Sequence, residues 1–225
     1  MNNERWGAVD SYLMDLLTPE DPALTAALEA SQEAGLPQIN VSPVQGQFLH
    51  LLARALRARN ILEIGTLGGY STIWLARALS QEGRLVTLEM DPEHAAVARG
   101  NFERAGLSKI IELRLGAALE TLPHLASEGH GNFDLIFIDA DKPNIPEYFK
   151  WALKLSHRGT LIIIDNVIRQ GSVADAESND PTIQGVRRLF ELIANEPRVS
   201  PAALQTVGNK GYDGFAFALV TTDPE

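Results

Sequence analysis

The chain carries two acidic clusters, and each one directly follows a short apolar run. Asp139 and Asp141 come after residues 133–138, and Asp165 with Asn166 comes after residues 161–164. Runs of this length and composition are typical of strands that are buried on both faces of a parallel sheet. Because ligands gather outside the carboxyl ends of such strands, we expect these four side chains to meet in one crevice.

Carboxylates that share a crevice repel one another unless a cation or protons lie between them. Oxygen ligands of this kind suit a hard divalent cation such as Mg²⁺, with the remaining positions left to water or substrate. The two clusters therefore predict metal-assisted chemistry. In the alternative interpretation, Asp165 ends its strand in solvent and Asn166 caps a turn.

A glycine-rich turn follows an earlier apolar run and leads into a helix, at residues 61–71. Its glycines would let the backbone approach a ligand closely, although the spacing is not the strict dinucleotide-binding pattern. Glu89 ends the next predicted strand, where the hydroxyls of a bound ribose would lie. Because Glu63 lies beside the turn and this segment has no basic residue, a neutral or cationic nucleoside is favoured over a pyrophosphate. The alternatives are a tight turn without a ligand, and Glu89 as a solvated acid or a helix cap.

Strands must alternate with helices to bring these segments to one sheet edge. The pattern predicts helices over residues 6–17, 22–34, 43–58, 71–79 and 92–105, and strands over 60–64, 84–89, 110–114, 133–139 and 160–165. In the tail it predicts a helix over 182–195 and an antiparallel strand pair, 203–207 and 214–221, around the break at 208–211. We therefore predict an α/β fold in a single domain, 1–225, with a helical N-terminal cover, 1–58, and a core, 59–225. Its mostly parallel seven-stranded sheet has an antiparallel C-terminal pair and helices on both faces.

The composition excludes several classes of protein. The 225 residues are 45% hydrophobic and 21% charged, and the formal net charge of -10 argues against a nucleic-acid partner. The absence of cysteine rules out disulfides and thiolate metal sites, which fits a reducing cytoplasm. There is no apolar segment of the roughly 20 residues that a membrane span needs, and no signal-peptide pattern. We expect a soluble cytoplasmic protein that acts on a small molecule.

Four segments, in order, carry a resemblance to a known family: residues 42–49, 62–71, 137–142 and 165–173. Over roughly residues 35–175 the chain resembles the class I S-adenosylmethionine-dependent methyltransferases. Within them it is most similar to the cation-dependent O-methyltransferases that act on catechols and caffeoyl-CoA. The resemblance implies a Rossmann-like sheet and a homodimer.

The resemblance also implies roles for individual residues. S-adenosylmethionine would be bordered by Val41, Glu63, Gly65, Thr66, Ser71, Glu89, Ala118 and Asp139. Mg²⁺, or another divalent cation such as Mn²⁺ or Ca²⁺, would be held by Asp139, Asp165 and Asn166. Asp139 would also approach the substrate, and Lys142 would be the general base. At Val41 the plant enzymes tend to carry a hydroxyl residue, and at Gln170 they place an asparagine on the acceptor.

Methyl transfer to a phenol requires deprotonation, because a phenol with a pKa near 10 is mostly protonated at neutral pH. A divalent cation bound to both oxygens of a catechol would lower that pKa and orient the acceptor. Lys142 could then take the proton if its own pKa fell from about 10.4. The alternative is that Lys142 is only an ion-pair partner of the neighbouring acids. Asp141 is interpreted as a supporting residue and not as a ligand.

The sequence thus predicts an S-adenosylmethionine-dependent O-methyltransferase that acts on a catechol-type small molecule with the help of a divalent cation. One alternative is an NAD(P)-dependent oxidoreductase on a similar fold, which the irregular glycine spacing disfavours. Another is a non-catalytic nucleoside-binding protein, which the acids around Lys142 disfavour. The sequence does not identify the acceptor.

Overall fold

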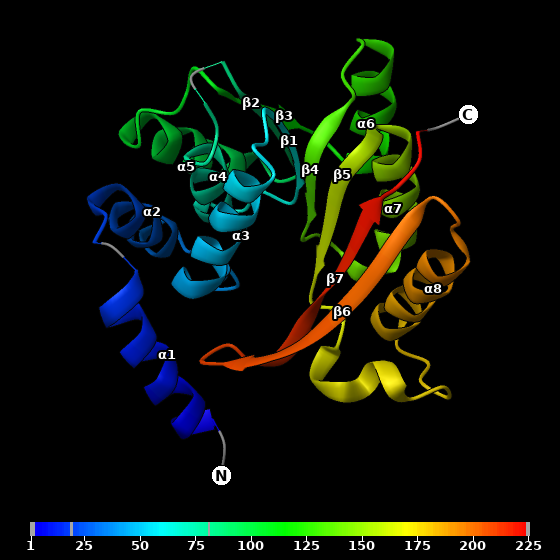
Figure 1. Ribbon diagram of the computed structural model, residues 1–225. Coiled ribbons are helices and arrows are strands. Elements are labelled where there is room, and N and C mark those ends of the chain that lie inside the picture. The colour runs from blue at the N-terminus through cyan, green and yellow to red at the C-terminus, as the bar shows by residue number, and fades with distance from the viewer. Residues whose placement is uncertain (1–2, 19, 81, 224–225) are drawn as a thin grey trace.

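The computed structural model describes residues 3–18, 20–80 and 82–223, and these form a layered α/β structure around one sheet (Figure 1). The seven strands of the sheet lie in the order β3-β2-β1-β4-β5-β7-β6. Neighbours from β3 to β5 are parallel, whereas β7 is antiparallel to both β5 and β6. The strands are β1 (Asn60–Ile64), β2 (Arg84–Glu89), β3 (Ile111–Leu115), β4 (Phe133–Ile138), β5 (Ser156–Asp165), β6 (Val199–Gly208) and β7 (Gly211–Val220).

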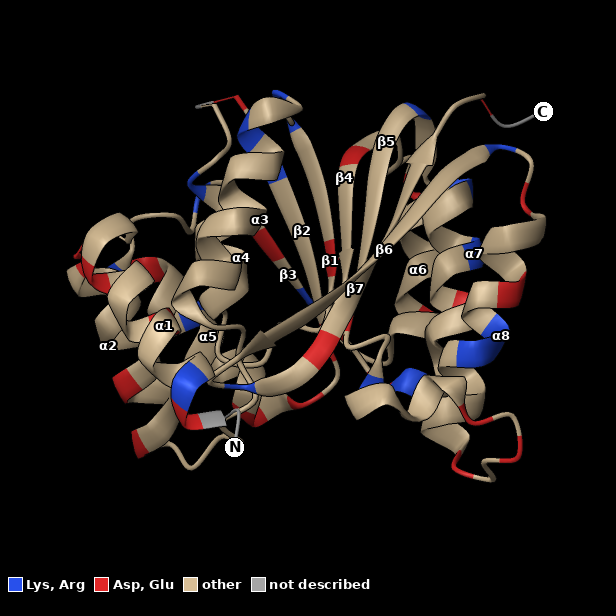
Figure 2. Ribbon diagram, turned by 60° about the horizontal axis from the view of Figure 1, so that its bottom comes forward, with Lys and Arg blue, Asp and Glu red and all other residues tan. Residues whose placement is uncertain are grey.

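Helices cover both faces of the sheet, as Figure 2 also shows. They are α1 (Asn3–Leu17), α2 (Pro22–Glu33), α3 (Pro43–Ala55), α4 (Tyr70–Ala76), α5 (Pro92–Arg104), α6 (Ala118–Ser127), α7 (Ile145–Lys154) and α8 (Pro181–Asn195). Two short 3₁₀ helices, η1 (Lys142–Asn144) and η2 (Arg169–Ala174), follow β4 and β5. One apolar core packs the helices α2, α3, α4 and α5 against one face of the sheet, and a second core packs α6, α7 and α8 against the other face.

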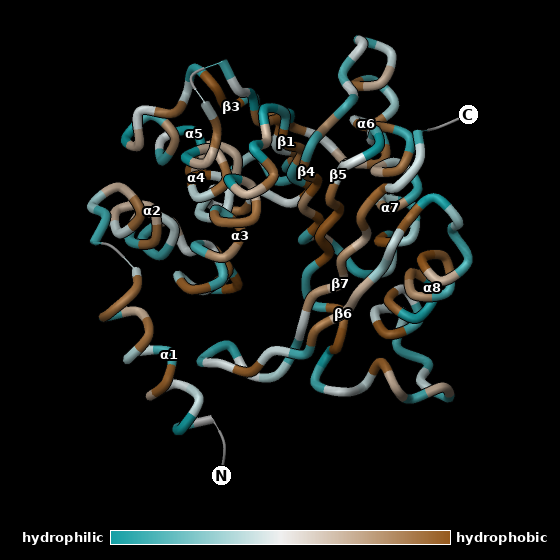
Figure 3. The backbone as a smooth tube through the Cα atoms, viewed as in Figure 1, coloured by the Kyte–Doolittle hydropathy of each residue, from teal (hydrophilic) through white to brown (hydrophobic). Residues whose placement is uncertain are grey.

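The central strands are apolar on both faces because both faces are covered. Along β4, Leu135 and Phe137 belong to one core, while Ile136 and Ile138 belong to the other. The same strands are largely brown in the hydropathy view (Figure 3), and Figure 2 shows only isolated acidic positions on them. This arrangement is what the short apolar runs predicted.

The predicted fold is confirmed, but several element ends differ. Helix α3 stops at Ala55 and not at residue 58, and Arg57 then takes a positive φ of 55°. Strand β5 begins at Ser156, four residues earlier than predicted. The prediction missed this start because the first residues of the strand are polar and carry no apolar pattern. Strand β6 runs from Val199 to Gly208, and not only over residues 203–207, although most of its residues are exposed. An edge strand has one neighbour and one covered face at most, so alternation is weak and Pro201 is tolerated.

Helix α1 lies apart from the two cores and reaches the tip of the β6–β7 hairpin (Figure 1). A carboxylate oxygen of Asp10 accepts a 2.7 Å hydrogen bond from the backbone N–H of Asn209. The hairpin tip is also joined to the segment before α3, since the Lys210 Nζ donates to the Gln38 carbonyl oxygen at 3.1 Å. None of the helices described is long and apolar enough to cross a membrane. A separate N-terminal cover, 1–58, within a single domain stays a prediction.

The turn after β1 has no room for a side chain at Gly65. Its φ is +101°, and a Cβ at this position would lie 2.1 Å from the carbonyl oxygen of Asp139. Only glycine fits such a close approach combined with a left-handed backbone. Gly65 therefore brings the ends of β1 and β4 together.

Glu63 anchors the same turn from below. It is fully buried, and its carboxylate accepts hydrogen bonds from Ser71 at 2.7 Å, from Thr87 at 2.7 Å and from Thr72. Burial raises the pKa of Glu63 to about 7, and the three hydroxyl donors only partly oppose that rise. The hydrogen bonds join β1, β2 and the start of α4 beneath the glycine-rich turn.

The raised pKa of Glu63 predicts a pH dependence of stability. Between pH 4.5 and 7 the folded protein keeps a proton that the unfolded chain has lost, so the free energy of unfolding falls as pH rises, by about 3 kcal/mol in all. Glu63→Gln removes the titrating group and keeps the shape. Denaturant unfolding of both proteins at pH 5 and pH 8 measures the difference, and the variant should show the smaller loss. Equal losses in the two proteins would contradict this account of Glu63.

Candidate functional site

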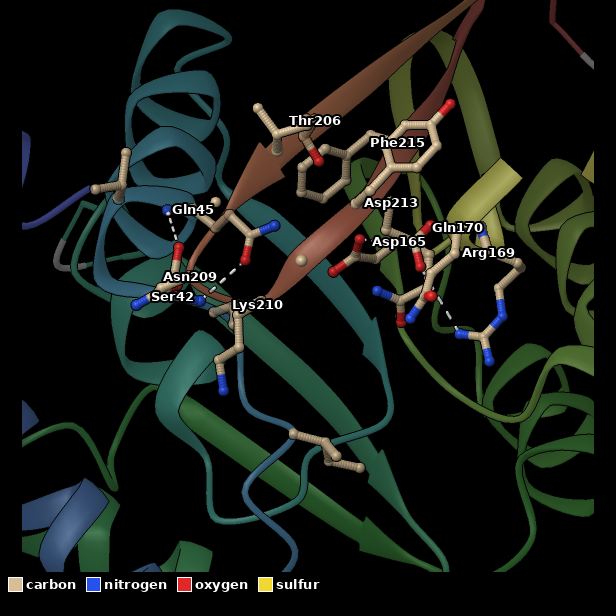
Figure 4. A pocket seen from close by; sticks show the side chains of 18 of the residues that line it. Ser42, Gln45, Asp165, Arg169, Gln170, Thr206, Asn209, Lys210, Asp213 and Phe215 are labelled. Carbon is tan, nitrogen blue, oxygen red and sulfur yellow. Dashed lines mark hydrogen bonds and ion pairs between the residues drawn. The ribbon is translucent and has the colours of Figure 1, made fainter. Parts of the chain in front are cut away.

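The carboxyl ends of the parallel strands border a cavity of about 700 Å³, here called the strand-end cavity. A second cavity of about 840 Å³, the hairpin cavity, lies between β5, the β6–β7 hairpin and the N-terminal segments (Figure 4). Ile39, Asn40, Val41, Asn166 and Arg169 line both. The two cavities therefore meet at the segment that follows β5.

Most of the residues predicted to border a cofactor lie around the strand-end cavity. The predicted residues that line it are Val41, Gly65, Thr66, Ser71, Glu89, Ala118 and Asp139. Glu63 is the exception, because it lies beneath the wall and supports Ser71 through their hydrogen bond. Its predicted contact with a cofactor remains untested.

Glu89 is held by backbone N–H groups from two turns. One carboxylate oxygen accepts from Thr66 at 3.3 Å and Leu67 at 2.7 Å, and the other accepts from Met90 at 2.9 Å and Asp91 at 3.0 Å. These four bonds fix the position of the carboxylate at the cavity wall. It therefore presents a preoriented acceptor for hydroxyl groups, which is the property that a ribose site needs.

Asp139 and Lys142 form an ion pair beside the cavity. Their Oδ1 and Nζ atoms are 3.1 Å apart, and the lysine side chain is only 8% exposed. Gly185 of α8 allows this placement, because a Cβ there would lie 2.1 Å from the carbonyl oxygen of Lys142. The structure therefore shows Lys142 as the ion-pair partner of Asp139.

Both carboxylate oxygens of Asp141 accept hydrogen bonds from neighbouring side chains. Its carboxylate accepts hydrogen bonds from Asn144 at 2.7 Å and from the hydroxyl of Tyr148. Burial and the adjacent carboxylate raise the pKa of Tyr148, so this phenol stays protonated and donates. These contacts fit the interpretation of Asp141 as a supporting residue.

Asp165 is buried at the end of β5, with 3% of its surface exposed. Burial and the nearby carboxylate of Asp139 raise its pKa to about 8, against the opposing charge of Lys142 and a 2.6 Å hydrogen bond from the Asn166 N–H. The charges of this chain therefore leave Asp165 incompletely compensated. A cation held by Asp139, Asp165 and the amide of Asn166 would supply the missing positive charge, so these residues fit a hard divalent ion.

The candidate set contains only two carboxylates and one amide. Among the described residues there is no group of three or more His, Cys, Asp and Glu side chains arranged to hold a metal ion. A site of this composition relies on water and substrate oxygens for its remaining ligands.

The segment after Asp165 has an unusual backbone. Asn166, Arg169 and Gln170 have positive φ values of 57°, 53° and 55°. Each such residue costs on the order of 1–3 kcal/mol and persists only when its surroundings hold it.

Asp213 of β7 supplies much of that support. Its Oδ1 accepts hydrogen bonds from the N–H groups of Ile168 at 2.9 Å, Arg169 at 3.0 Å and Gly214 at 3.0 Å. Sequence reasoning missed Asp213, since it lies 45 residues beyond Ile168 and follows no strand end.

The hairpin cavity combines an aromatic wall with polar ends. Phe48, Tyr212 and Phe215 line it, and the ring centroids of Phe48 and Phe215 are 6.3 Å apart. Figure 4 shows Arg169 beside Asp165 and Asp213 on one side, and Lys210 with Ser42 and Asn209 on the other. The dimensions and lining of the cavity suit a flat aromatic molecule that carries polar groups.

Comparison with known proteins shows relatives over almost the whole chain. A family model described as O-methyltransferase matches residues 16–215. A protein named catechol O-methyltransferase from Niastella koreensis is 56% identical over 98% of this chain and 100% of its own. A protein of the same name from Mycobacterium tuberculosis is 54% identical over 94% of each chain.

Solved structures agree with this result. An O-methyltransferase from Bacillus cereus, solved in complex with SAH, has a TM-score of 0.96 and 59% identity over 97% of this chain and 100% of that one. The O-methyltransferase TomG from Streptomyces achromogenes, solved in complex with SAM, has a TM-score of 0.95 and 51% identity over 98% and 99%. With the fold and these relatives taken together, the chain belongs to the O-methyltransferase family.

Proposed function

We propose that this protein transfers a methyl group from S-adenosylmethionine to one hydroxyl of a catechol-type small molecule, with the help of a divalent cation. The observation that carries the proposal is the meeting of the two cavities at Asn166, directly beside Asp165 and within reach of the Asp139–Lys142 pair. One cavity has the features of a nucleoside site and the other suits an aromatic acceptor. The names of the relatives from Niastella koreensis and Mycobacterium tuberculosis support the same acceptor class.

The strand-end cavity is the proposed site for S-adenosylmethionine. Glu89 would accept the ribose hydroxyls, and the glycine-rich turn at Gly65 and Thr66 would lie against the methionine portion. Because Asp139 and Asp141 also border this cavity, its charge favours a sulfonium cation over a pyrophosphate. The Bacillus cereus and Streptomyces achromogenes structures contain SAH and SAM, which supports the assignment.

The acceptor is proposed to lie in the hairpin cavity with its diol toward Asp165 and Asn166. A divalent cation at Asp139, Asp165 and Asn166 would lower the pKa of the phenol and fix its orientation. The aromatic wall would hold the ring, and Lys142 in its neutral amine form would receive the phenolic proton at Nζ. In-line displacement then requires the acceptor oxygen to be held close to the methyl carbon, which the junction of the two cavities permits. The homodimer stays a prediction.

Replacing Glu89 tests the cofactor site. Glu89→Gln keeps the size of the side chain but removes the charge that four backbone N–H groups and the ribose would share. We expect the Kd for S-adenosylmethionine to rise about 10- to 100-fold, since a hydrogen bond to a charged group is worth about 1.5–3 kcal/mol. Isothermal titration measures it. A variant that binds as tightly as the wild type would refute the role of Glu89.

Metal removal tests the cation. Turnover of a simple catechol should require Mg²⁺ and should stop with excess EDTA. In Asp165→Ala the metal-dependent turnover should be abolished while S-adenosylmethionine binding is kept, because Asp165 lines the hairpin cavity and not the strand-end cavity. Full activity in EDTA, or in the variant, would overturn the cation assignment. Cofactor binding without turnover of any diol would point to the non-catalytic alternative.

A pair of substitutions at Lys142 separates a base from an ion-pair partner. Lys142→Arg keeps a positive charge beside Asp139, but a guanidinium does not deprotonate near neutral pH. Lys142→Met removes both properties. If Lys142 takes the proton, kcat should fall about 100-fold or more in both variants. If only the ion pair matters, the arginine variant should retain most of the wild-type kcat.

A further inference from the structure

We propose that Asp213 is a positioning residue for the cation site, which acts by holding the backbone that presents Asn166. This inference rests on the cation site of the proposed function. Asp213 itself is not a proposed ligand. Its role follows from its place on β7 and from the groups that its carboxylate accepts.

The strand register places Asp213 just beyond the end of β5. Asp165 is paired with Phe215 in the antiparallel β5–β7 ladder, so a residue two positions earlier on β7 faces the segment that continues from β5. The ladder is prolonged by a 3.2 Å hydrogen bond from the Val167 N–H to the Gly214 carbonyl oxygen. Figure 4 shows the side chain of Asp213 next to that of Asp165.

One oxygen of Asp213 organises both strands at this point. Oδ1 accepts the N–H groups of Ile168 and Arg169 from the segment after β5, and that of Gly214 from its own strand. The other oxygen, Oδ2, lies 3.8 Å from the guanidinium of Arg169. Asp213 therefore fixes the course of the chain across residues 167–169, immediately after the proposed ligands.

The segment needs such support because its conformation is unfavourable by itself. Asn166, Arg169 and Gln170 all have positive φ values, and none of them is glycine. Without the hydrogen bonds from Ile168 and Arg169 to Asp213, residues 166–170 would be free to relax to ordinary backbone angles. Asn166 would then lose the backbone conformation that holds it at the wall of both cavities. Partners that orient metal ligands in this way commonly change metal affinity by about 10- to 100-fold when they are removed.

Close packing around Gly214 also holds the segment after β5 in place. A Cβ on Gly214 would lie 2.0 Å from the carbonyl oxygen of Leu204 and 2.7 Å from the side chain of Ile168. The segment thus packs directly on the β7 backbone next to Asp213. The hydrogen bonds and the packing define one position for it.

The test measures Mn²⁺ binding to the full chain by the EPR signal of free Mn²⁺, without any need for turnover. Asp213→Ala removes the acceptor, and we expect Mn²⁺ affinity to fall about 10- to 100-fold. Asp213→Asn keeps an Oδ1 acceptor and loses the charge, so its affinity should lie closer to the wild type than to the alanine variant. This rescue distinguishes positioning by hydrogen bonds from simple attraction of the cation by a negative charge.

Asp134→Ala is the matched control. The Asp134 carboxylate accepts backbone N–H groups from Arg59 at 2.7 Å and Asn60 at 2.8 Å, but at the opposite end of the sheet. The Asp134→Ala substitution should lower the midpoint temperature of thermal unfolding and leave the Mn²⁺ affinity unchanged. S-adenosylmethionine binding, measured by titration, should be kept in all three variants.

The outcomes separate the two levels of the proposal. If the wild type does not bind Mn²⁺, the cation site of the proposed function is wrong. If the wild type binds and Asp213→Ala binds equally well, the positioning role is wrong while the site stands. The role is also overturned if the asparagine variant is as weak as the alanine variant, or if Asp134→Ala weakens binding to the same extent. Should the alanine variant fail to fold, the asparagine variant decides, since retained affinity supports the role and a loss of about tenfold or more overturns it.

Discussion

Carboxylates buried at the carboxyl edge of the sheet each require hydrogen-bond donors or positive charge, because ionised groups are costly to remove from water. This requirement shapes the region where the strands end. Glu63 takes three hydroxyl groups, Glu89 takes four backbone N–H groups, and Asp213 takes three. Asp139 has the ammonium of Lys142. Asp165 has the weakest compensation, since in the described part of the chain its one hydrogen-bond donor is the neighbouring Asn166 N–H.

The carboxylates of the site differ in how many hydrogen-bond donors and positive charges surround them. Some are therefore fixed by the protein itself, whereas others still need positive charge. Glu89 joins the turn after β1 to the turn after β2, so the wall of the strand-end cavity is built before any ligand arrives. Glu63, with its raised pKa, supports the same turn from within the core. Burial raises the pKa of Asp165, and repulsion from the carboxylate of Asp139 raises it further. The charge that a divalent cation would bring is therefore needed at one point, where the two cavities meet.

The hairpin cavity, which is the proposed acceptor site, depends on segments that are far apart along the chain. The β6–β7 hairpin reaches α1 through Asn209 and Asp10, and reaches the segment before α3 through Lys210 and Gln38. These contacts close the hairpin cavity opposite the strand ends. Exposed loops and edge strands bear few packing constraints, so this wall is free to vary between relatives that keep the same strand ends. The wall of the hairpin cavity is therefore less constrained by the fold than the wall of the strand-end cavity.

The sequence by itself determined the sheet and its chemistry-bearing edge, because apolar runs at residues 133–138 and 161–164 can be buried only as central strands, and Asp139, Asp165 and Glu89 follow from where strands end. It did not reveal the full length of β6, since an exposed edge strand needs no apolar pattern. Only the tertiary structure decided that Glu63 lies beneath the cavity and that Asp213 holds the segment after β5. Each of these depends on contacts between distant parts of the chain. The spacing of residues along one strand or helix does not predict which distant strand will pack beside it.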